Sequence, residues 1–236
     1  MKLPTLPIHE RFNAFQGEGV HMGRSAFFVR TFGCPVKCPW CDSAGTWHKD
    51  WVPDHINRMT TEAIVAEIVE ADPSMVVITG GEPTVHDLSD LARAIRNDTA
   101  ATVHVETCGA FEYTRDTFDW VTLSPKWDRV PLAANIRSCS ELKIIVDQED
   151  SIDRWLSFLS LSIGSDVLEL EKPIWLHPEW SQRNNPLILN KIAEMVKTHG
   201  GPLRAGWQLH KLYKVDALDD RAAKQAPLGG NPALGL

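Results

Sequence analysis

Three cysteines stand close together in the first fifth of the chain, with the spacing C-x3-C-x2-C. Three thiolates on one short loop can each bind one iron of a cubane cluster, which leaves the fourth iron without a protein ligand. An open iron can bind and reduce a small molecule, whereas a cluster with four cysteine ligands mainly carries electrons. The spacing therefore predicts a reactive [4Fe–4S] cluster on Cys34, Cys38 and Cys41.

A zinc site is the main alternative for these cysteines, with a nearby histidine such as His48 as the fourth ligand. Zinc sites usually show two separated pairs of ligands rather than three cysteines on one loop, so the spacing favours the cluster. The chain has five cysteines, an odd number that does not suit a disulfide framework. For Cys108 and Cys139 we expect buried structural thiols.

The composition limits the class of protein. The 236 residues fit one large domain or at most two small ones. A net charge of −7 argues against a general nucleic-acid binder, which would show a basic surface. We find no run of about 18 apolar residues that would predict a membrane span. Residues 1–11 lack the apolar stretch of a secretion signal, so we expect a cytoplasmic protein.

The elements that must position the cysteines alternate between strands and helices. An apolar run at 25–32 predicts a strand directly before Cys34, and Thr60 or Thr61 would cap a helix that reaches Val69. Further strands are expected at 75–79, 102–107, 120–123, 141–146, 174–177 and 204–209, and further helices at 88–95, 152–161 and 187–198. This alternation predicts an α/β fold, a partial, open β/α barrel of about six parallel units. We expect residues 1–215 to form this domain and residues 216–236 to form a C-terminal extension or tail.

In a parallel barrel the working residues lie just past the carboxyl ends of the strands. Thr79, Gly80, Gly81 and Glu82 follow the second predicted strand. Adjacent glycines let a backbone approach a ligand closely, and a carboxylate behind them can accept hydrogen bonds from an ammonium group. A simple turn is the alternative, since Gly-Gly is a common breaker of regular structure. The QGEG segment at 16–19 is, on its own, a flexible polar turn.

Taken together, these motifs resemble a known family. The cysteine loop, with Trp40 in its aromatic position, is similar to the signature of the radical S-adenosylmethionine (SAM) superfamily. With QGEG before it and TGGEP after it, the chain resembles the 7-carboxy-7-deazaguanine synthase family from about His9 to Lys214. The later motifs of that family follow in order: Glu106-Thr107 with Gly109, Ser124-Pro125-Lys126, Glu141-Leu142-Lys143 and Gln208-x-His210-Lys211. The combination is far more specific than any one piece.

The resemblance implies that the open iron chelates SAM and that one electron splits SAM into methionine and a 5′-deoxyadenosyl radical. It implies conversion of 6-carboxy-5,6,7,8-tetrahydropterin to 7-carboxy-7-deazaguanine with loss of ammonia, towards queuosine-type deazapurines. The radical comes from SAM, so no side chain is assigned as a catalytic residue. A Mg²⁺ ion, a flavodoxin- or ferredoxin-type electron donor and a homodimer are also implied.

Site residues follow from the resemblance position by position. Implied contacts of the pterin are Phe15, Gln16, Gly17, Arg30 and Thr79. Implied contacts of SAM are Trp40, Asp42, Gly81, Glu82, Ser124, Pro125 and Lys126. Ser43 would hold Mg²⁺, although an ordinary loop serine is the alternative there. Arg30 suits its role because a guanidinium fork pairs well with a carboxylate, but an Arg at a strand end is as common. His177 stands where the family has Gln, which leaves that SAM contact open.

Two other functions compete with this interpretation. An activase that installs a glycyl radical on a partner protein shares the cysteine loop and a similar size, but the QGEG segment and the Ser-Pro-Lys turn weigh against it. A zinc-binding or iron–sulfur scaffold without catalysis would need no Gly-Gly-Glu motif.

Overall fold

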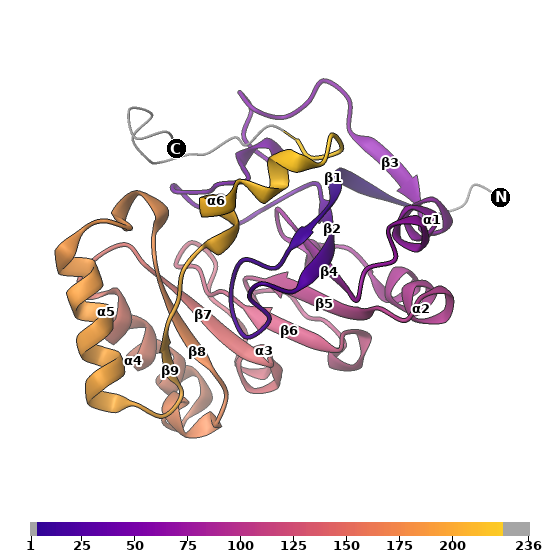
Figure 1. Ribbon diagram of the computed structural model, residues 1–236. Coiled ribbons are helices and arrows are strands. Elements are labelled where there is room, and N and C mark those ends of the chain that lie inside the picture. Colours follow the sequence, from indigo (N-terminus) through magenta and orange to yellow (C-terminus); the bar gives the residue numbers. More distant parts are fainter. Residues whose placement is uncertain (1–3, 224–236) are drawn as a thin grey trace.

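A nine-stranded sheet forms the centre of the computed structural model, which describes residues 4–223 (Figure 1). The strand order is β3-β1-β2-β4-β5-β6-β7-β8-β9, and every pair from β2 to β9 is parallel. The strands are β1 Thr5–Phe15, β2 Ser25–Thr31, β3 Asn57–Thr60, β4 Met75–Gly80, β5 Thr102–Thr107, β6 Trp120–Leu123, β7 Glu141–Val146, β8 Ile174–Pro178 and β9 Leu203–Ala205. The helices are α1 Thr61–Ala71, α2 Ser89–Asp98, α3 Ala133–Ser138, α4 Ser151–Ile163, α5 Pro186–His199 and α6 Leu209–Tyr213. The α/β fold with an open, mostly parallel sheet is therefore confirmed, and β3 and β9 remain at its two edges.

Helix formation follows the apolar periodicity of the chain. The hydroxyl of Thr60 accepts a hydrogen bond from the Ala63 amide at 3.3 Å and caps α1, as expected. Helix α1 then buries Ile64, Val65 and Ile68, which lie three and four residues apart on one face. These side chains join one continuous apolar core between the helices and the sheet.

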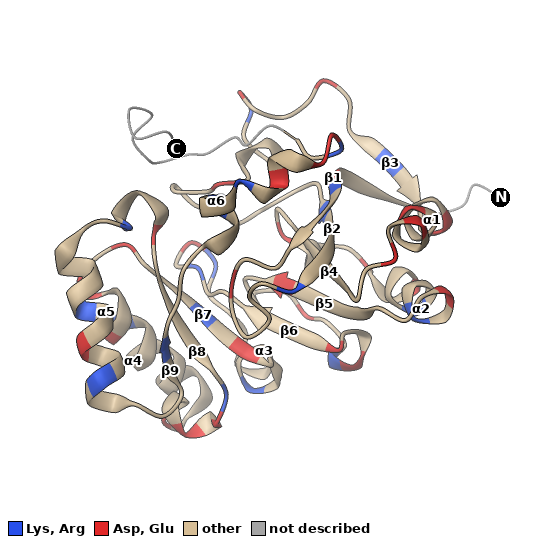
Figure 2. Ribbon diagram, viewed as in Figure 1, with Lys and Arg blue, Asp and Glu red and all other residues tan. Residues whose placement is uncertain are grey.

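The two faces of the sheet differ in polarity. Along each parallel strand, alternate side chains enter the helix-covered core, such as Val105 of β5 and Leu142 of β7. Their neighbours Glu106 and Lys143 point to the concave inner face instead. Figure 2 shows charged residues within the strands as well as on the helices. The inner face therefore carries the polar side chains that a site needs.

One predicted strand is wrong over most of its length. Strand β9 ends at Ala205, although a strand was expected to reach residue 209. Gln208 turns away from the sheet because its side-chain amide donates to Glu18, and the amide of Leu209 donates to the carbonyl of Gly17 at 3.0 Å. Helix α6 begins at that point. The chain leaves the sheet because its polar groups bind the loop between β1 and β2.

Two antiparallel strands lie at the edge where the sequence predicted none. Strand β1 pairs with β2 along most of its length and with β3 through Thr5–Ile8. Its pattern is hard to recognise because Glu10, a charged residue, is buried at 8% exposure between the inward Ile8 and Phe12. A register irregularity between Ile8 and Glu10 further disturbs the alternation.

The loop at 16–24 fills the open side of the curved sheet. The amide of Val20 donates to Glu141 at 3.0 Å. A side chain at Gly17 would stand 2.0 Å from the ring of His210, and one at Gly19 would stand 2.4 Å from Glu141. Gly19 also has a φ of +69°, which favours glycine. Both glycines therefore let this loop pack closely against the later elements.

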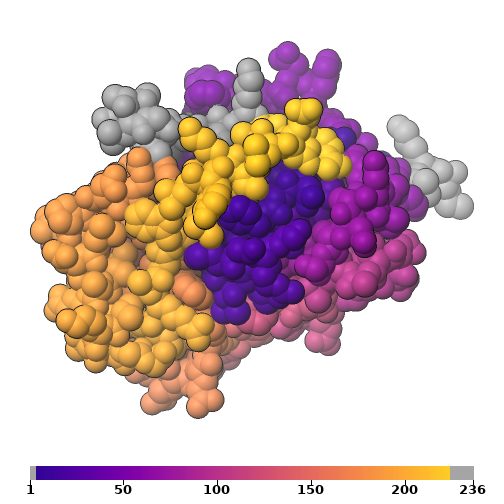
Figure 3. Space-filling view, in the orientation of Figure 1, coloured from indigo at the N-terminus to yellow at the C-terminus, as the bar shows by residue number. Residues whose placement is uncertain are grey.

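The start of the predicted C-terminal extension packs against β1. Val215–Leu218 forms a 3-10 turn, and residues 219–223 follow it. The space-filling view shows this last segment lying across the N-terminal strands (Figure 3). Residues 224–236 lie outside the described residues, and the domain division at 215 stays a prediction.

Among residues 4–223, no helix is long and apolar enough to cross a membrane.

Candidate active site

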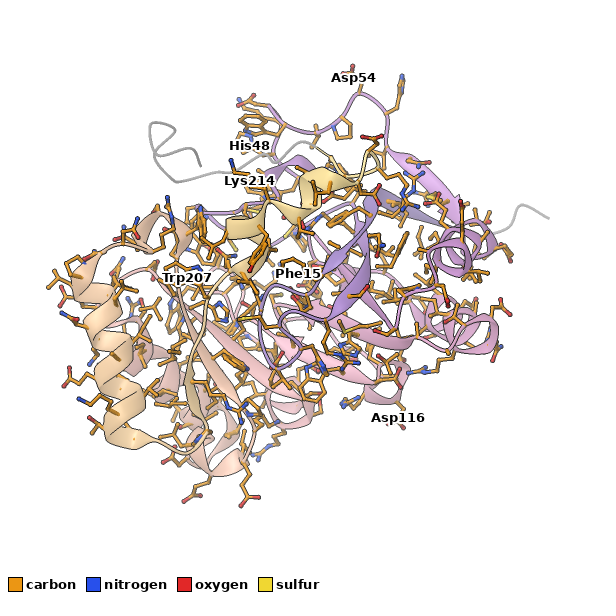
Figure 4. The ribbon with its side chains drawn as sticks, viewed as in Figure 1. Phe15, His48, Asp54, Asp116, Trp207 and Lys214 are labelled. Atoms are coloured by element: carbon orange, nitrogen blue, oxygen red, sulfur yellow. The ribbon has the colours of Figure 1, made fainter. Side chains whose placement is uncertain are left out.

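A cavity of about 660 Å³ opens on the concave face of the sheet, at the carboxyl ends of the strands. It brings together residues that are far apart in the sequence, and of the predicted site residues only Gly17 and Pro125 do not line it. Figure 4 marks two lining residues, Phe15 at the end of β1 and Lys214 after α6. The position matches the expectation for a β/α barrel.

The cysteine loop forms one wall of this cavity. Cys34, Cys38 and Cys41 pack against one another and against Trp40. The indole of Trp47 donates to the Cys41 sulfur at 3.4 Å. Burial raises the pKa of all three thiols, that of Cys38 to about 11, so a metal must displace their protons when it binds.

The number of thiols on this loop is one fewer than the number of irons in a cubane cluster. Within residues 4–223, no group of three or more His, Cys, Asp or Glu side chains could hold a single metal ion. Thiolates that each bind a different iron of a cubane do not need to converge on one point. Three thiols on one cavity wall therefore fit a cluster with one iron facing the cavity.

Gly80 lies against Thr31 of β2, and Gly81 lies against the cysteine loop. A side chain on Gly81 would stand 2.3 Å from the Gly33 carbonyl oxygen and 2.7 Å from the Cβ of Cys34. The Gly81 amide donates to the carbonyl of Thr31 at 3.2 Å. The two glycines therefore have a packing role in addition to any contact with a ligand, because a residue with a side chain would prevent the end of β4 from approaching its neighbours so closely.

Glu82 is buried at 2% exposure and already accepts hydrogen bonds from the protein. Its Oε1 accepts from the amide and hydroxyl of Thr84, at 3.1 and 2.6 Å, and from the hydroxyl of Thr107 at 2.6 Å. Its Oε2 accepts from the amide of Cys108 at 2.8 Å. The carboxylate therefore joins the ends of β4 and β5, and Oε2 keeps capacity for one more donor.

The Ser-Pro-Lys turn presents a cation to the cavity. Lys126 Nζ donates to the carbonyl and to the hydroxyl of Ser124, both at 2.7 Å, and lies 5.5 Å from the ring centroid of Trp40. Burial lowers the pKa of Lys126. The next residue, Trp127, stacks on Trp155 of α4 at 3.7 Å between ring centroids. This stack anchors the turn to the helix layer.

A second group of charges also lines the cavity. Arg30 Nε lies 2.5 Å from a carboxylate oxygen of Glu10. Asp42 accepts from the Ser43 hydroxyl at 3.1 Å and pairs with Lys211 at 3.1 Å. Burial would raise the pKa of Asp42, but Lys211 and Arg30 together hold it well below its usual range.

A buried polar network joins the predicted site residue Gln16 to Glu18, Glu106, Lys143 and Gln208, which were not predicted site residues. Lys143 donates to Glu18 and, at 3.2 Å, to Glu106. Gln16 donates to Glu106 and Gln208 donates to Glu18, both at 2.8 Å. Burial would raise the pKa of Glu18 and lower that of Lys143, but their attraction reverses both shifts. The sequence signal that could have indicated this network is a charged residue within an apolar strand: Glu106 in TVHVET and Lys143 in ELKIIV.

Comparison with known proteins identifies the family of this chain. The model of the radical SAM superfamily matches residues 28–125. A 7-carboxy-7-deazaguanine synthase of Synechocystis sp. is 40% identical over 89% of this chain and 94% of its own length. Another, of Pyrobaculum aerophilum, is 30% identical over 86% and 87% of the two chains. The crystal structure of QueE from Escherichia coli has a TM-score of 0.72 and 27% identity, covering 87% of this chain and 95% of its own. The chain therefore belongs to the 7-carboxy-7-deazaguanine synthase family of radical SAM enzymes.

Proposed function

We propose that this chain converts 6-carboxy-5,6,7,8-tetrahydropterin to 7-carboxy-7-deazaguanine with release of ammonia, in 7-deazapurine biosynthesis. The observation that carries the proposal is a single cavity that is lined both by the three thiols and by Arg30, whose guanidinium suits a carboxylate. Relatives that carry the name of this activity match most of the chain. The comparisons do not favour a glycyl-radical activase or a non-catalytic scaffold.

The cluster and SAM would occupy the wall formed by the cysteine loop. Cys34, Cys38 and Cys41 would hold the [4Fe–4S] cluster, and SAM would lie beside Trp40 and Lys126, which contact each other. When bound, they supply the abstraction of a hydrogen atom from the substrate. The ammonium of Lys126 suits the SAM carboxylate, and Ser124 and Pro125 shape the turn that presents it. Asp42, Gly81 and Glu82 complete the assigned contacts.

The pterin would lie across the cavity from the thiols. Glu10 occupies Nε of Arg30, and Nη1 donates one hydrogen to the Gly80 carbonyl at 3.5 Å. Nη2 and the other hydrogen of Nη1 remain for the substrate carboxylate. Phe15 and Thr79 line the cavity beside it. The side-chain amide of Gln16 belongs to the buried network, and this network would offer hydrogen-bond donors and acceptors to the polar edge of the pyrimidine ring. Gly17 would let the backbone beside Gln16 pack closely against His210.

Mg²⁺ is assigned to Ser43. Its hydroxyl lines the cavity, and Mg²⁺ typically keeps several waters and takes oxygens from substrate as well as protein. Asp42 is already compensated by Lys211, so the substrate carboxylate would supply the charge that the ion needs. Replacing Ser43 with Ala should raise the Mg²⁺ concentration at half-maximal activity.

Three further assignments accompany this function. A flavodoxin- or ferredoxin-type protein would supply the electron, and the exposed Pro35, Lys37 and Pro39 place the cysteine loop at the surface. A homodimer is proposed, supported by the exposed Leu212 and Tyr213 on α6. A cytoplasmic location is supported by the five free cysteines, which a reducing compartment preserves.

The test is anaerobic reconstitution with iron and sulfide, followed by reductant, SAM, Mg²⁺ and 6-carboxytetrahydropterin. The product is followed by mass spectrometry, with Cys38→Ala as the control. A deazaguanine carboxylate that is absent from the variant supports the proposal. Cleavage of SAM to 5′-deoxyadenosine without that product would reject the substrate, and zinc without a cluster would reject the cofactor.

A further inference from the structure

We propose that Glu10 is a positioning residue for the substrate carboxylate: it orients Arg30 and, with its other oxygen, fastens the segment 215–223 beside the cavity. This inference rests on the proposed function, in which Arg30 binds the carboxylate of the pterin. Glu10 is not itself assigned a contact with the substrate.

The first observation is the geometry of the Glu10–Arg30 pair. The two residues face each other across the antiparallel ladder of β1 and β2. Glu10 Oε1 lies 2.5 Å from Arg30 Nε, and the side chains are only 9% and 18% exposed. Burying an unpaired carboxylate in a strand, between apolar neighbours, costs folding free energy. The pairing with Arg30 offsets that cost, so the two residues depend on each other.

The pair leaves the outer edge of the guanidinium available. Glu10 contacts Nε, whereas Nη1 lies 3.5 Å from the carbonyl of Gly80, at the end of β4. Burial would lower the pKa of Arg30, but Glu10, Asp42 and Asp216 raise it. Without Glu10, the guanidinium could turn towards Asp42 or Asp216, which would then occupy the nitrogens that the substrate needs. The role of Glu10 is therefore orientation.

The second observation is that the same carboxylate binds the C-terminal segment. Glu10 Oε2 accepts a hydrogen bond from the amide of Ala223 at 2.5 Å. Asp219 accepts from the amide of Asn13 at 2.8 Å and binds Arg221 at 3.0 and 2.7 Å. Strand β3 pairs with β1 only through Thr5–Ile8, so these contacts cover the edge of β1 beyond it.

The segment also reaches the cavity. Asp216, Ala217 and Ala222 line it, and Asp216 is close enough to Arg30 to raise its pKa. Arg221 lies 5.2 Å from the ring centroid of Phe27, which fixes the segment to β2. The Glu10 carboxylate therefore connects two parts of the site: the segment 215–223, which lines the cavity, and Arg30, which would bind the substrate.

The test compares two ligands on the reconstituted enzyme with SAM: 6-carboxytetrahydropterin and tetrahydropterin without the carboxyl group. Affinities are measured anaerobically by calorimetry, and KM and kcat are measured with the carboxylated substrate. Glu10→Ala should weaken binding of the carboxylated ligand about 10- to 100-fold, because the arginine loses its orientation. Binding of the second ligand should stay within about twofold, and KM should rise far more than kcat.

Glu10→Gln separates the two roles. Its amide oxygen can still accept from Arg30 Nε, while its NH₂ group then faces the amide of Ala223, which is also a donor. This variant should keep the affinity for the carboxylated ligand within about threefold. It should nevertheless be cut faster by trypsin after Arg221, as Glu10→Ala is, with the cut site identified by mass spectrometry. Exposed Glu149→Ala is the matched control and should change neither readout.

Equal weakening of both ligands in Glu10→Ala, or of neither, would overturn the orienting role. Unchanged cleavage after Arg221 in both Glu10 variants would overturn the fastening role. If Glu10→Ala does not fold, as judged by circular dichroism, Glu10→Leu, which keeps most of the side-chain volume but cannot accept from Arg30, replaces it in both readouts with the same expected results. A wild-type enzyme that binds neither pterin would instead reject the proposed function.

Discussion

Replacing Lys143 with Met removes the one cation at the centre of the buried network. Lys143 is 9% exposed and donates to both Glu18 and Glu106. Met has a similar length and no charge, so the packing is largely kept. Glu18 retains its hydrogen bond from Gln208, and Glu106 retains the one from Gln16. The substitution therefore leaves two buried carboxylates partly solvated by amides but without a counter-charge.

Breaking a buried ion pair by removing one partner costs about 3–5 kcal/mol. Because both carboxylates keep one amide donor, and the Glu106 side chain is 20% exposed, we expect the lower end, about 3 kcal/mol. That is a large share of the roughly 5–15 kcal/mol by which proteins are usually stable.

The pH dependence of this loss has a defined sign. In the wild type, Lys143 holds the pKa of Glu18 below its usual range, so the pair stabilises the protein above the unfolded pKa of about 4.3 and less as the pH falls. In Lys143→Met, the main charge that opposes burial is gone and one amide hydrogen bond to each carboxylate remains, so burial raises the carboxylate pKa above the unfolded value. The folded variant then takes up a proton on acidification, and its stability deficit shrinks as the pH falls, by up to about 1.4 kcal/mol per pH unit.

The measurement is urea unfolding of the cluster-free protein, followed by circular dichroism between about pH 5.5 and 7.5. The difference between variant and wild type at each pH removes contributions that both share. Lys197→Met, on the exposed face of α5, is the matched control. A deficit below about 1 kcal/mol, or one that grows on acidification, would refute the reasoning.

Two further outcomes follow from the fold and the cavity wall. Gly81→Ala would place a Cβ 2.3 Å from the Gly33 carbonyl, so the reconstituted variant should lose most of its iron and sulfide. Gly164→Ala, at the end of α4, also strains the backbone because its φ is +69°, but nothing lies within 4 Å of its Cβ, so it should keep them. Equal iron in both would contradict the close packing. Burial lowers the pKa of His104 to about 3 and of His177 to about 4, so the unfolded chain takes up protons near pH 6.5 that the folded chain does not. The cluster-free protein should therefore lose stability as the pH falls from about 7 to 5, less so in His104→Asn, and a flat urea midpoint over this range would contradict it.

Much of the fold could be predicted because most of its strands are buried on the core side and flanked by helices. Strands β5, β6 and β7 were predicted with the limits that the structure has, since their apolar runs end at clear breaks. Helix α3 was not predicted, because it is only six residues long and buries Asn135, whose amide donates to the carbonyls of Gly109 and Phe111. Strand β1 was not predicted for the same reason. Glu10 is a buried polar residue that pairs with Arg30, and it interrupts the apolar alternation by which a strand is recognised.

The residues around the cavity could be predicted from short motifs, but their pairing could not. Gln16 and Glu106 are 90 positions apart, and Glu18 and Lys143 are 125 apart. Local periodicity carries no information about such contacts. Glu82 shows the same limit, since the sequence predicts a ligand-binding carboxylate and the structure adds its hydrogen bonds to Thr84, Thr107 and Cys108.

Whether one iron stays open to SAM depends on Cys108, a fourth thiol that packs against the three of the cysteine loop. Electron paramagnetic resonance of the reduced, reconstituted protein, before and after addition of SAM, measures this directly. We predict that Cys108→Ala keeps the iron content of the wild type and that SAM shifts the signal in both, while Cys38→Ala loses the cluster. Loss of the cluster in Cys108→Ala, or a wild-type signal that SAM leaves unchanged, would contradict an open iron in this cavity.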